Sequence, residues 1–135
     1  MSNLLRNAAI NSSALEEWLC RAAERELQLD ELQRLAEREG VDLRQLFDAL
    51  ACRVAEQYVS NAWSYAVCNR TMNALFGLMR QTQQCPDLAF AIFFAFCAGQ
   101  KSQAQGPRGL SAEELYTRPM MARILPGRWN TAPPG

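Results

Sequence analysis

The sequence contains no histidine, and this absence narrows the chemistry that the chain can perform. Histidine is the usual general base near neutral pH and the commonest ligand for transition metals in proteins. The five cysteines are widely spaced, without a CxxC pair, at positions 20, 52, 68, 85 and 97. We therefore expect no metal centre, no cofactor and no enzymatic activity, and we interpret the cysteines as reduced, small hydrophobic residues.

Long apolar segments and an excess of one charge are also missing. The longest apolar run, Leu88–Ala98, is shorter than the ~20 residues of a membrane-spanning helix. Residues 1–10 lack the apolar core of a secretory signal. The formal net charge is zero, so no overall field attracts nucleic acid or an anionic membrane. We therefore expect a cytoplasmic protein whose partner is neither a membrane nor a nucleic acid.

The charges that are present are distributed unevenly. Residues 11–40 contain eight acidic residues and four arginines, a net charge of −4, whereas residues 61–135 carry a net charge of +4. Two interpretations are open. The two regions are solvated faces that partly complement each other across the fold, or the acidic region is a surface that attracts a basic partner.

The apolar run predicts a buried helix. Four of the six phenylalanines lie in it, and a helix that is apolar on every side needs neighbours all round. Pro86 is typical of the first residue of a helix, and Gly99 is typical of a left-handed residue that ends one. We predict a single all-α domain over 1–125, a bundle of five or six helices around the buried apolar helix 86–98. Residues 126–135, rich in Pro and Gly, are expected to be an extended tail.

The remaining helices are predicted from capping signals and apolar periodicity. Four Ser or Asp residues are each followed three positions later by Glu or Gln, the pattern of a capping box: Ser13, Asp30, Asp42 and Ser111. The predicted helices are an amphipathic one over 14–27, a short one ended by Gly40, a long one from Asp42 to Tyr58, and another from Trp63 to Met79. Pro119 is expected to separate two short pieces at 112–117 and 119–125.

Residues 32–50 have the spacing of apolar residues that is typical of a helix-turn-helix, with Gly40 and Val41 at the turn. A recognition helix needs donors for phosphates and base edges. The second helix offers Asp42, Arg44 and Asp48 without net positive charge, and the first is acidic. We therefore favour a structural helical hairpin, and a DNA-binding regulator remains an alternative.

Two further features each have a structural and a functional interpretation. Cys85 precedes a helix, whose N-terminus lowers the pKa of a thiol, but no neighbouring base supports catalysis. Asn69 and Asn73 lie one turn apart on one helix face. We favour the interpretation that Asn73 hydrogen-bonds the backbone of a loop, and a binding face is the alternative.

Two segments resemble small all-helical bacterial proteins, some of which are associated with toxin-immunity loci. The first is AEQYVSNAWSYAVCNRTMNAL at 55–75, and the second is PDLAFAIFFAFCAGQ at 86–100, followed by LYTRPM at 115–120. The sequence differs from the pattern at Asn69, Cys97 and Gln100, where the resemblance implies acidic residues. The resemblance implies a non-enzymatic binding protein.

The leading hypothesis is therefore a protein-binding protein, of the immunity or antitoxin type, that occludes a cognate toxin. An acidic face shields the cationic active site of a basic toxin domain and speeds association. The side chains assigned to this contact are Glu24, Glu31, Glu37 and Glu39. The alternatives are a DNA-binding regulator that uses 32–50 and a helical adaptor or secretion chaperone.

Overall fold

The computed structural model describes residues 12–23, 28–100 and 111–125. Within these ranges the chain forms six α-helices and one π-helical turn, without a strand. The elements are α2 (Ser12–Ala23), α3 (Leu29–Glu39), α4 (Leu43–Val59), α5 (Tyr65–Thr82), α6 (Asp87–Gly99), η2 (Glu113–Thr117) and α7 (Arg118–Ile124). The all-α class and the single packed bundle are confirmed. The predicted tail at 126–135 lies outside the described residues.

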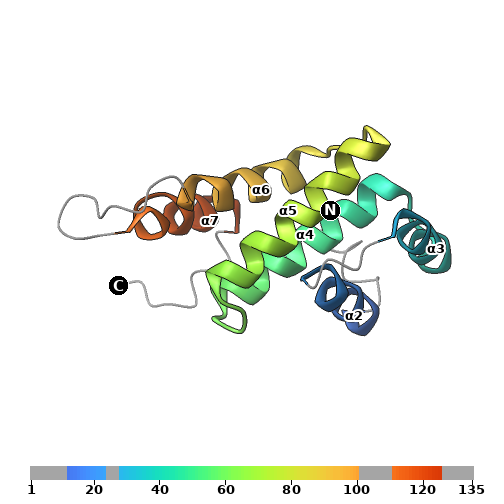
Figure 1. Cartoon of the computed structure of the whole chain (residues 1–135), viewed down its shortest axis with the longest axis horizontal. Helices are drawn as coiled ribbons and strands as arrows, with labels where there is room; N and C mark the ends of the chain where they lie inside the picture. Colours follow the sequence, from blue (N-terminus) through green and yellow to red (C-terminus); the bar gives the residue numbers. More distant parts are fainter. Residues whose placement is uncertain (1–11, 24–27, 101–110, 126–135) are drawn as a thin grey trace.

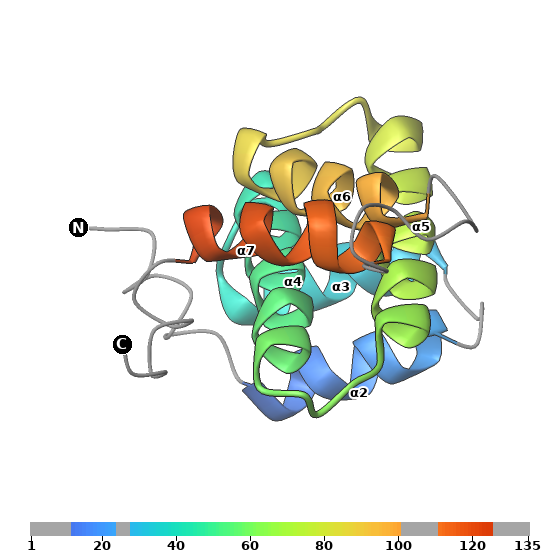
Figure 2. The ribbon, with the colours of Figure 1, turned by 90° about the vertical axis from the view of Figure 1, so that its left-hand side faces the viewer.

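The helices are arranged on the two sides of the α4–α5 pair. Figure 1 shows α6 and α7 on one side of this pair and α2 and α3 on the other. Figure 2, turned by 90°, shows the same order, with α7 and α6 far from α2. Helix α4 contacts α2, α3, α5 and α6, so it lies at the centre of the fold.

Several helix ends follow their local sequence signals. Asp42 and Gln45 form a complete capping box at the start of α4, with backbone-to-side-chain distances of 2.8 and 3.0 Å. Gly40 has φ +71° and ends α3 in the left-handed conformation, as predicted. The prediction for Asp30 is wrong, because α3 begins one residue earlier and has no side-chain cap. Ser64 caps α5, with its side chain accepting from the backbone N–H of Val67, and α4 ends at Val59.

The apolar helix is less enclosed than the sequence indicates. Helix α6 buries Ala89, Ile92, Ala95 and Phe96 against its neighbours, but its opposite face is open. The prediction of burial on every side is therefore wrong for one face. An apolar run predicts that a helix is buried against other elements, but the run alone does not specify which elements bury it or on which sides. Helix α4 contributes more buried residues to the core than α6 does.

Helix α6 ends by close packing against η2. Gly99 is the last residue of α6 and is not left-handed, which corrects the prediction for its backbone. A Cβ atom at this position would overlap with Thr117 Oγ1 and lie 2.9 Å from the Tyr65 hydroxyl. Glycine is needed here because another part of the chain approaches the backbone.

Pro119 does not interrupt the C-terminal helix. The chain passes from η2 directly into α7, and the backbone N–H of Arg118 donates to the carbonyl of Glu113, five residues earlier. Proline has no N–H and its ring crowds the carbonyl four residues before it. The wider π turn accommodates the ring, so one continuous helix replaces the two predicted pieces. The Ser111–Glu114 capping box at its start is confirmed.

Candidate protein-binding surface

The structure does not gather the four predicted glutamates into one free acidic surface. Glu31 forms an ion pair of 2.5 Å with Arg21, which joins α3 to α2. The side chain of Glu39 is 14% exposed and lies 3.9 Å from Arg38. Glu37 is exposed, and Glu24 lies outside the described residues. Two of the four carboxylates are thus engaged within the fold.

Another acidic residue of the same region also contributes to packing. Glu16 on α2 pairs with Arg53 on α4 at 2.5 Å, and Arg53 in turn contacts Glu56 at 3.2 Å. The pairs Arg21–Glu31, Arg53–Glu16 and Arg53–Glu56 all lie between positions 16 and 56. These acidic residues therefore pair with arginines of their own half of the chain.

The pKa shifts of Cys68, Cys85 and Cys97 disfavour the thiolate form. All five are free, with Cys52 and Cys68 buried. Desolvation raises the pKa of Cys68 to about 12. The pKa of Cys85 is also raised, chiefly by desolvation, although Arg44 opposes the shift. This direction is opposite to the lowering of a thiol pKa that a helix N-terminus by itself produces.

A buried polar cluster fixes η2 to the rest of the bundle. Thr117 Oγ1 donates to the carbonyl of Ala95 at 2.7 Å, and the Tyr58 hydroxyl donates to the Glu113 carboxylate at 2.5 Å. The Tyr65 hydroxyl donates to the carbonyl of Phe96. Burial raises the pKa of Tyr65 to about 12, so this phenol stays a donor near neutral pH. These bonds hold the inner side of α6 and leave its outer side open.

Aromatic side chains cover the open side of α6. Phe90 and Phe94 are 44% and 51% exposed, which is unusual for large apolar residues on a well-packed helix. Their ring centroids lie 6.2 Å apart. Phe93 lies beside them and stacks on Phe76 of α5, with centroids 4.0 Å apart. We call Phe90 and Phe94, with Phe76 and Phe93 at their base, the aromatic ridge.

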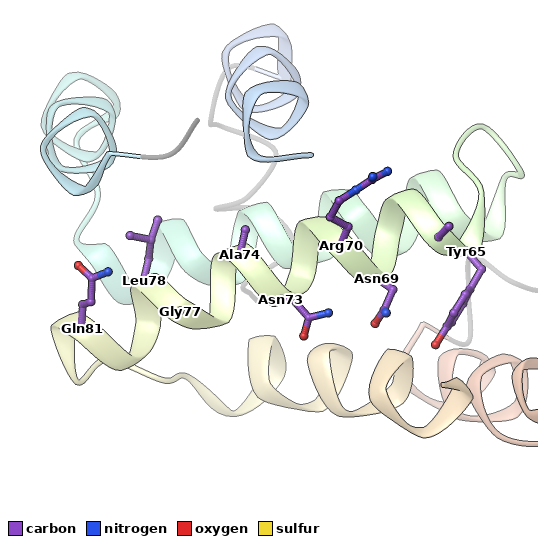
Figure 3. Close-up of a pocket in the computed structure, with 9 residues that line it drawn as sticks. Tyr65, Asn69, Arg70, Asn73, Ala74, Gly77, Leu78 and Gln81 are labelled. Carbon is purple, nitrogen blue, oxygen red and sulfur yellow. The ribbon is translucent and has the colours of Figure 1, made fainter. Parts of the chain in front are cut away.

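A groove of about 690 Å³ runs along the neighbouring helix α5. Its lining includes small residues and neutral amides: Tyr65, Ala66, Asn69, Arg70, Asn73, Ala74, Gly77, Leu78 and Gln81. Figure 3 shows Asn69 and Asn73 pointing towards α6, and Arg70, Ala74 and Leu78 pointing towards α2 and α3. We call this feature the α5 groove. It borders the aromatic ridge, because Asn73 in the groove and Phe76 in the ridge are three residues apart on α5.

The two asparagines of the groove differ in their contacts. Asn69 Nδ2 donates to Gln100 Oε1 at 2.5 Å and so joins α5 to the end of α6. Asn73 is exposed, and among the described residues we find no loop backbone that binds its amide. The favoured interpretation of Asn73 is therefore not supported within the described ranges.

Gly77 lies in the interior of α5, and the described residues give no packing reason for a glycine there. A Cβ atom at this position would meet nothing within 4 Å, in contrast to Gly99, and its φ angle is ordinary. Glycine in a helix interior costs about 0.5–1 kcal/mol relative to alanine. The missing side chain adds depth to the α5 groove, which Gly77 lines.

Gly77→Ala is accordingly expected to raise the free energy of unfolding of the isolated chain by about 0.5–1 kcal/mol. Chemical denaturation followed by circular dichroism measures the change. A loss of stability would show that the glycine is required by the fold of the chain itself. It would then give no support to a functional role of the groove.

Neither a metal site nor a membrane-spanning helix is seen in the described parts of the chain. There, no group of three or more cysteines and carboxylates is placed to hold a metal ion. In the same ranges, we find no helix with both the length and the apolar character needed to cross a membrane. The α5 groove and the aromatic ridge are the features from which a function is proposed.

Comparison with known proteins does not assign this chain to a family. No model of a known protein family, no curated protein and no solved structure matches the chain.

Proposed function

We propose that this chain is a non-enzymatic protein-binding domain that contacts its partner through the aromatic ridge and the α5 groove. The observation that carries the proposal is the exposure of Phe90 and Phe94 at 44% and 51% within a contiguous cluster of rings. Exposed apolar patches on folded proteins mark interaction sites, and aromatic residues are enriched at the centres of interfaces.

The neighbouring groove supports the same assignment. Its amides at Asn69, Asn73 and Gln81 both donate and accept hydrogen bonds, as a polar rim requires. Arg70 is the charged residue among the described lining residues, and α5 contains no acidic residue. An apolar centre with a polar rim is the usual anatomy of a protein interface.

We further propose that the partner is a toxin domain that this protein occludes. The segments that resemble proteins of toxin-immunity loci, 55–75 and 86–100, contain most of α5 and all of α6. Phe90 and Phe94 of the ridge and Asn69 and Asn73 of the groove lie in these segments, whereas Phe76, Gly77 and Gln81 lie between them. In this proposal the aromatic ridge makes the central contact, and Glu37 lies elsewhere on the molecule, on α3.

Neither alternative function is supported by a specific observation. In a DNA-binding regulator, α4 would enter a groove of the duplex, but α4 is enclosed by four helices. Asp48 on this helix accepts a hydrogen bond from the backbone of Ala89 at 3.1 Å and thus faces α6. No observation favours a secretion chaperone or an adaptor over a toxin-binding protein.

The test begins with affinity capture of the tagged chain from its native cell lysate, with the neighbouring genes co-expressed and the captured proteins identified by mass spectrometry. The affinity of the captured partner is then measured by calorimetry for the wild type and for Phe90→Ser/Phe94→Ser. We expect the double substitution to weaken binding by about 100-fold or more, because buried aromatic residues dominate interface energies.

Tyr116→Ser is the matched control, since Tyr116 is 49% exposed and lies on η2, outside the aromatic ridge. The control should leave the affinity unchanged, and circular dichroism should show that both variants are folded. Equal affinity of the wild type and the double variant would remove the aromatic ridge from the interface.

A further inference from the structure

Another pocket lies on the side of the α4–α5 pair that is away from the aromatic ridge. Helices α2 and α3 line this pocket, which has a volume of about 270 Å³ (Figure 1). The two helices pack on α4 and α5 more than on each other, and the ion pair between Arg21 and Glu31 joins them. A small separation of the two helices is therefore enough to admit a ligand. We call this feature the α2–α3 pocket.

Two residues that line the α2–α3 pocket have a buried polar atom without a hydrogen-bond partner. Trp18 is 5% exposed, and its indole Nε1 is an unmatched donor. Glu31 bonds Arg21 through Oε2, and its other oxygen, Oε1, is an unmatched acceptor. Among the described residues there are three such atoms, and two of them thus belong to one pocket. Because buried polar groups are nearly always hydrogen-bonded, the unmatched donor and acceptor point to a bound molecule that supplies both partners.

The charged residues of the α2–α3 pocket favour an anion. They are three arginines and two glutamates, with a net charge of +1: Arg21, Arg34, Arg38, Glu17 and Glu31. Arg34 and Arg38 are exposed and lie one turn apart on α3. Their ion-pair contacts, to Asp30 at 3.5 Å and to Glu39 at 3.9 Å, are long, so most of their N–H groups remain able to bind a ligand. Guanidinium groups bind phosphate well because their donors match its oxygens.

We infer that the α2–α3 pocket binds a phosphate group that carries a proton. The charged phosphate oxygens accept hydrogen bonds from the Trp18 indole and from the two exposed arginines, and the P–OH group donates to Glu31 Oε1. Sulfate has the same shape but no proton at neutral pH, so its oxygens would meet the Glu31 carboxylate without a hydrogen bond. The pocket therefore selects phosphate over sulfate. This site is independent of the proposed partner contact, because the two use different helices.

The experiment follows the indole N–H signals of the three tryptophans in nitrogen-edited NMR spectra of the full chain. The Trp18 signal is assigned from its absence in Trp18→Phe, and inorganic phosphate or sulfate is added at constant ionic strength and neutral pH. Phosphate should move the Trp18 signal downfield and saturate it at a concentration at least about 10-fold lower than sulfate requires. A Trp18 signal that stays in place, or moves equally with both anions, would overturn the inference and leave a buried water as the partner of the indole.

The exposed arginines of the pocket provide variants that leave the core intact. Arg34→Gln/Arg38→Gln should weaken phosphate binding by about 10-fold or more, because the substitutions remove two charged donors. Arg70→Gln is the matched control, since Arg70 is exposed on α5 outside this pocket, and it should bind phosphate like the wild type. Equal affinities of the double variant and the wild type would contradict the assignment of the pocket.

The source of the phosphate is distinguished by repeating the titration with glycerol phosphate. A phosphate monoester loses its last proton at a pH of about 6, whereas inorganic phosphate keeps one proton well above neutral pH. At a pH of about 5.5, where both ligands carry a proton, the tighter ligand identifies the source as a phosphate monoester or as free phosphate. At a pH of about 8, glycerol phosphate should bind about 10-fold or more weakly than at the lower pH. Equal binding of the monoester at both pH values would contradict the contact between P–OH and Glu31.

Discussion

Phe96→Ala should lower the free energy of unfolding by about 3–5 kcal/mol, the range for truncation of a buried aromatic residue. Phe96 is fully buried, and its ring packs edge-on against Tyr58 with centroids 5.2 Å apart. It also contacts Tyr65, whose hydroxyl bonds to the Phe96 carbonyl. The truncation would leave a cavity where α4, α5 and α6 meet. Urea denaturation measures the loss.

Phe94→Ala is the matched control on the same helix. Phe94 is 51% exposed, so its removal takes little buried area from the fold and should cost about 1 kcal/mol or less. Similar losses for the two variants would contradict the orientation of α6. The pair of substitutions therefore reports which face of α6 is packed and which is open.

Gly99→Ala should destabilise the protein by about 1–3 kcal/mol, the typical cost of overpacking a filled interior. The new Cβ would overlap with Thr117 Oγ1, and Thr117 is itself fully buried and bonded to the carbonyl of Ala95. The predicted sign is opposite to that for Gly77→Ala, although both glycines lie in helices. Denaturation curves of the two variants, measured under one set of conditions, check this contrast.

The cause of the Gly99 effect is tested by a second substitution at the contact. Thr117→Ala removes the oxygen that the new methyl group would meet. The double variant Gly99→Ala/Thr117→Ala should therefore lose at least about 1 kcal/mol less than the two single variants together. Simple additivity would show that the strain at Gly99 arises elsewhere, for example at the Tyr65 hydroxyl.

Local signals in the sequence predicted the helices well because the hydrogen bonds involved span only a few residues. The capping boxes at Asp42 and Ser111 and the left-handed Gly40 are all present. Asp30 carries a similar capping signal, but α3 begins before it. A capping pattern shows where a helix is able to begin, and neighbouring residues decide whether it begins earlier.

The site was harder to predict than the helices. The acidic residues of 16–39 suggested a free surface, yet Glu16 and Glu31 pair with Arg53 and Arg21. The partners in these pairs are 37 and 10 residues apart in the sequence, so a local sequence pattern does not predict them. The exposure of the phenylalanines could have been anticipated from one feature of the sequence. The apolar run of α6 has no polar face, so the sequence does not specify which of its sides is buried. The face with Asn69 and Asn73 was identified as the alternative interpretation, and it lines the groove.

The sequence by itself determined the all-α class and most of the helix positions, because periodicity and capping act within one helix. The tertiary structure alone decided which face of α6 stays open, why Gly99 is glycine and where the acidic residues pair. Each of these depends on atoms contributed by distant parts of the chain, such as Thr117 against Gly99 and Phe76 beneath Phe90. An apolar side chain is driven out of water by its own chemistry, but the elements that cover it are set by how the helices pack.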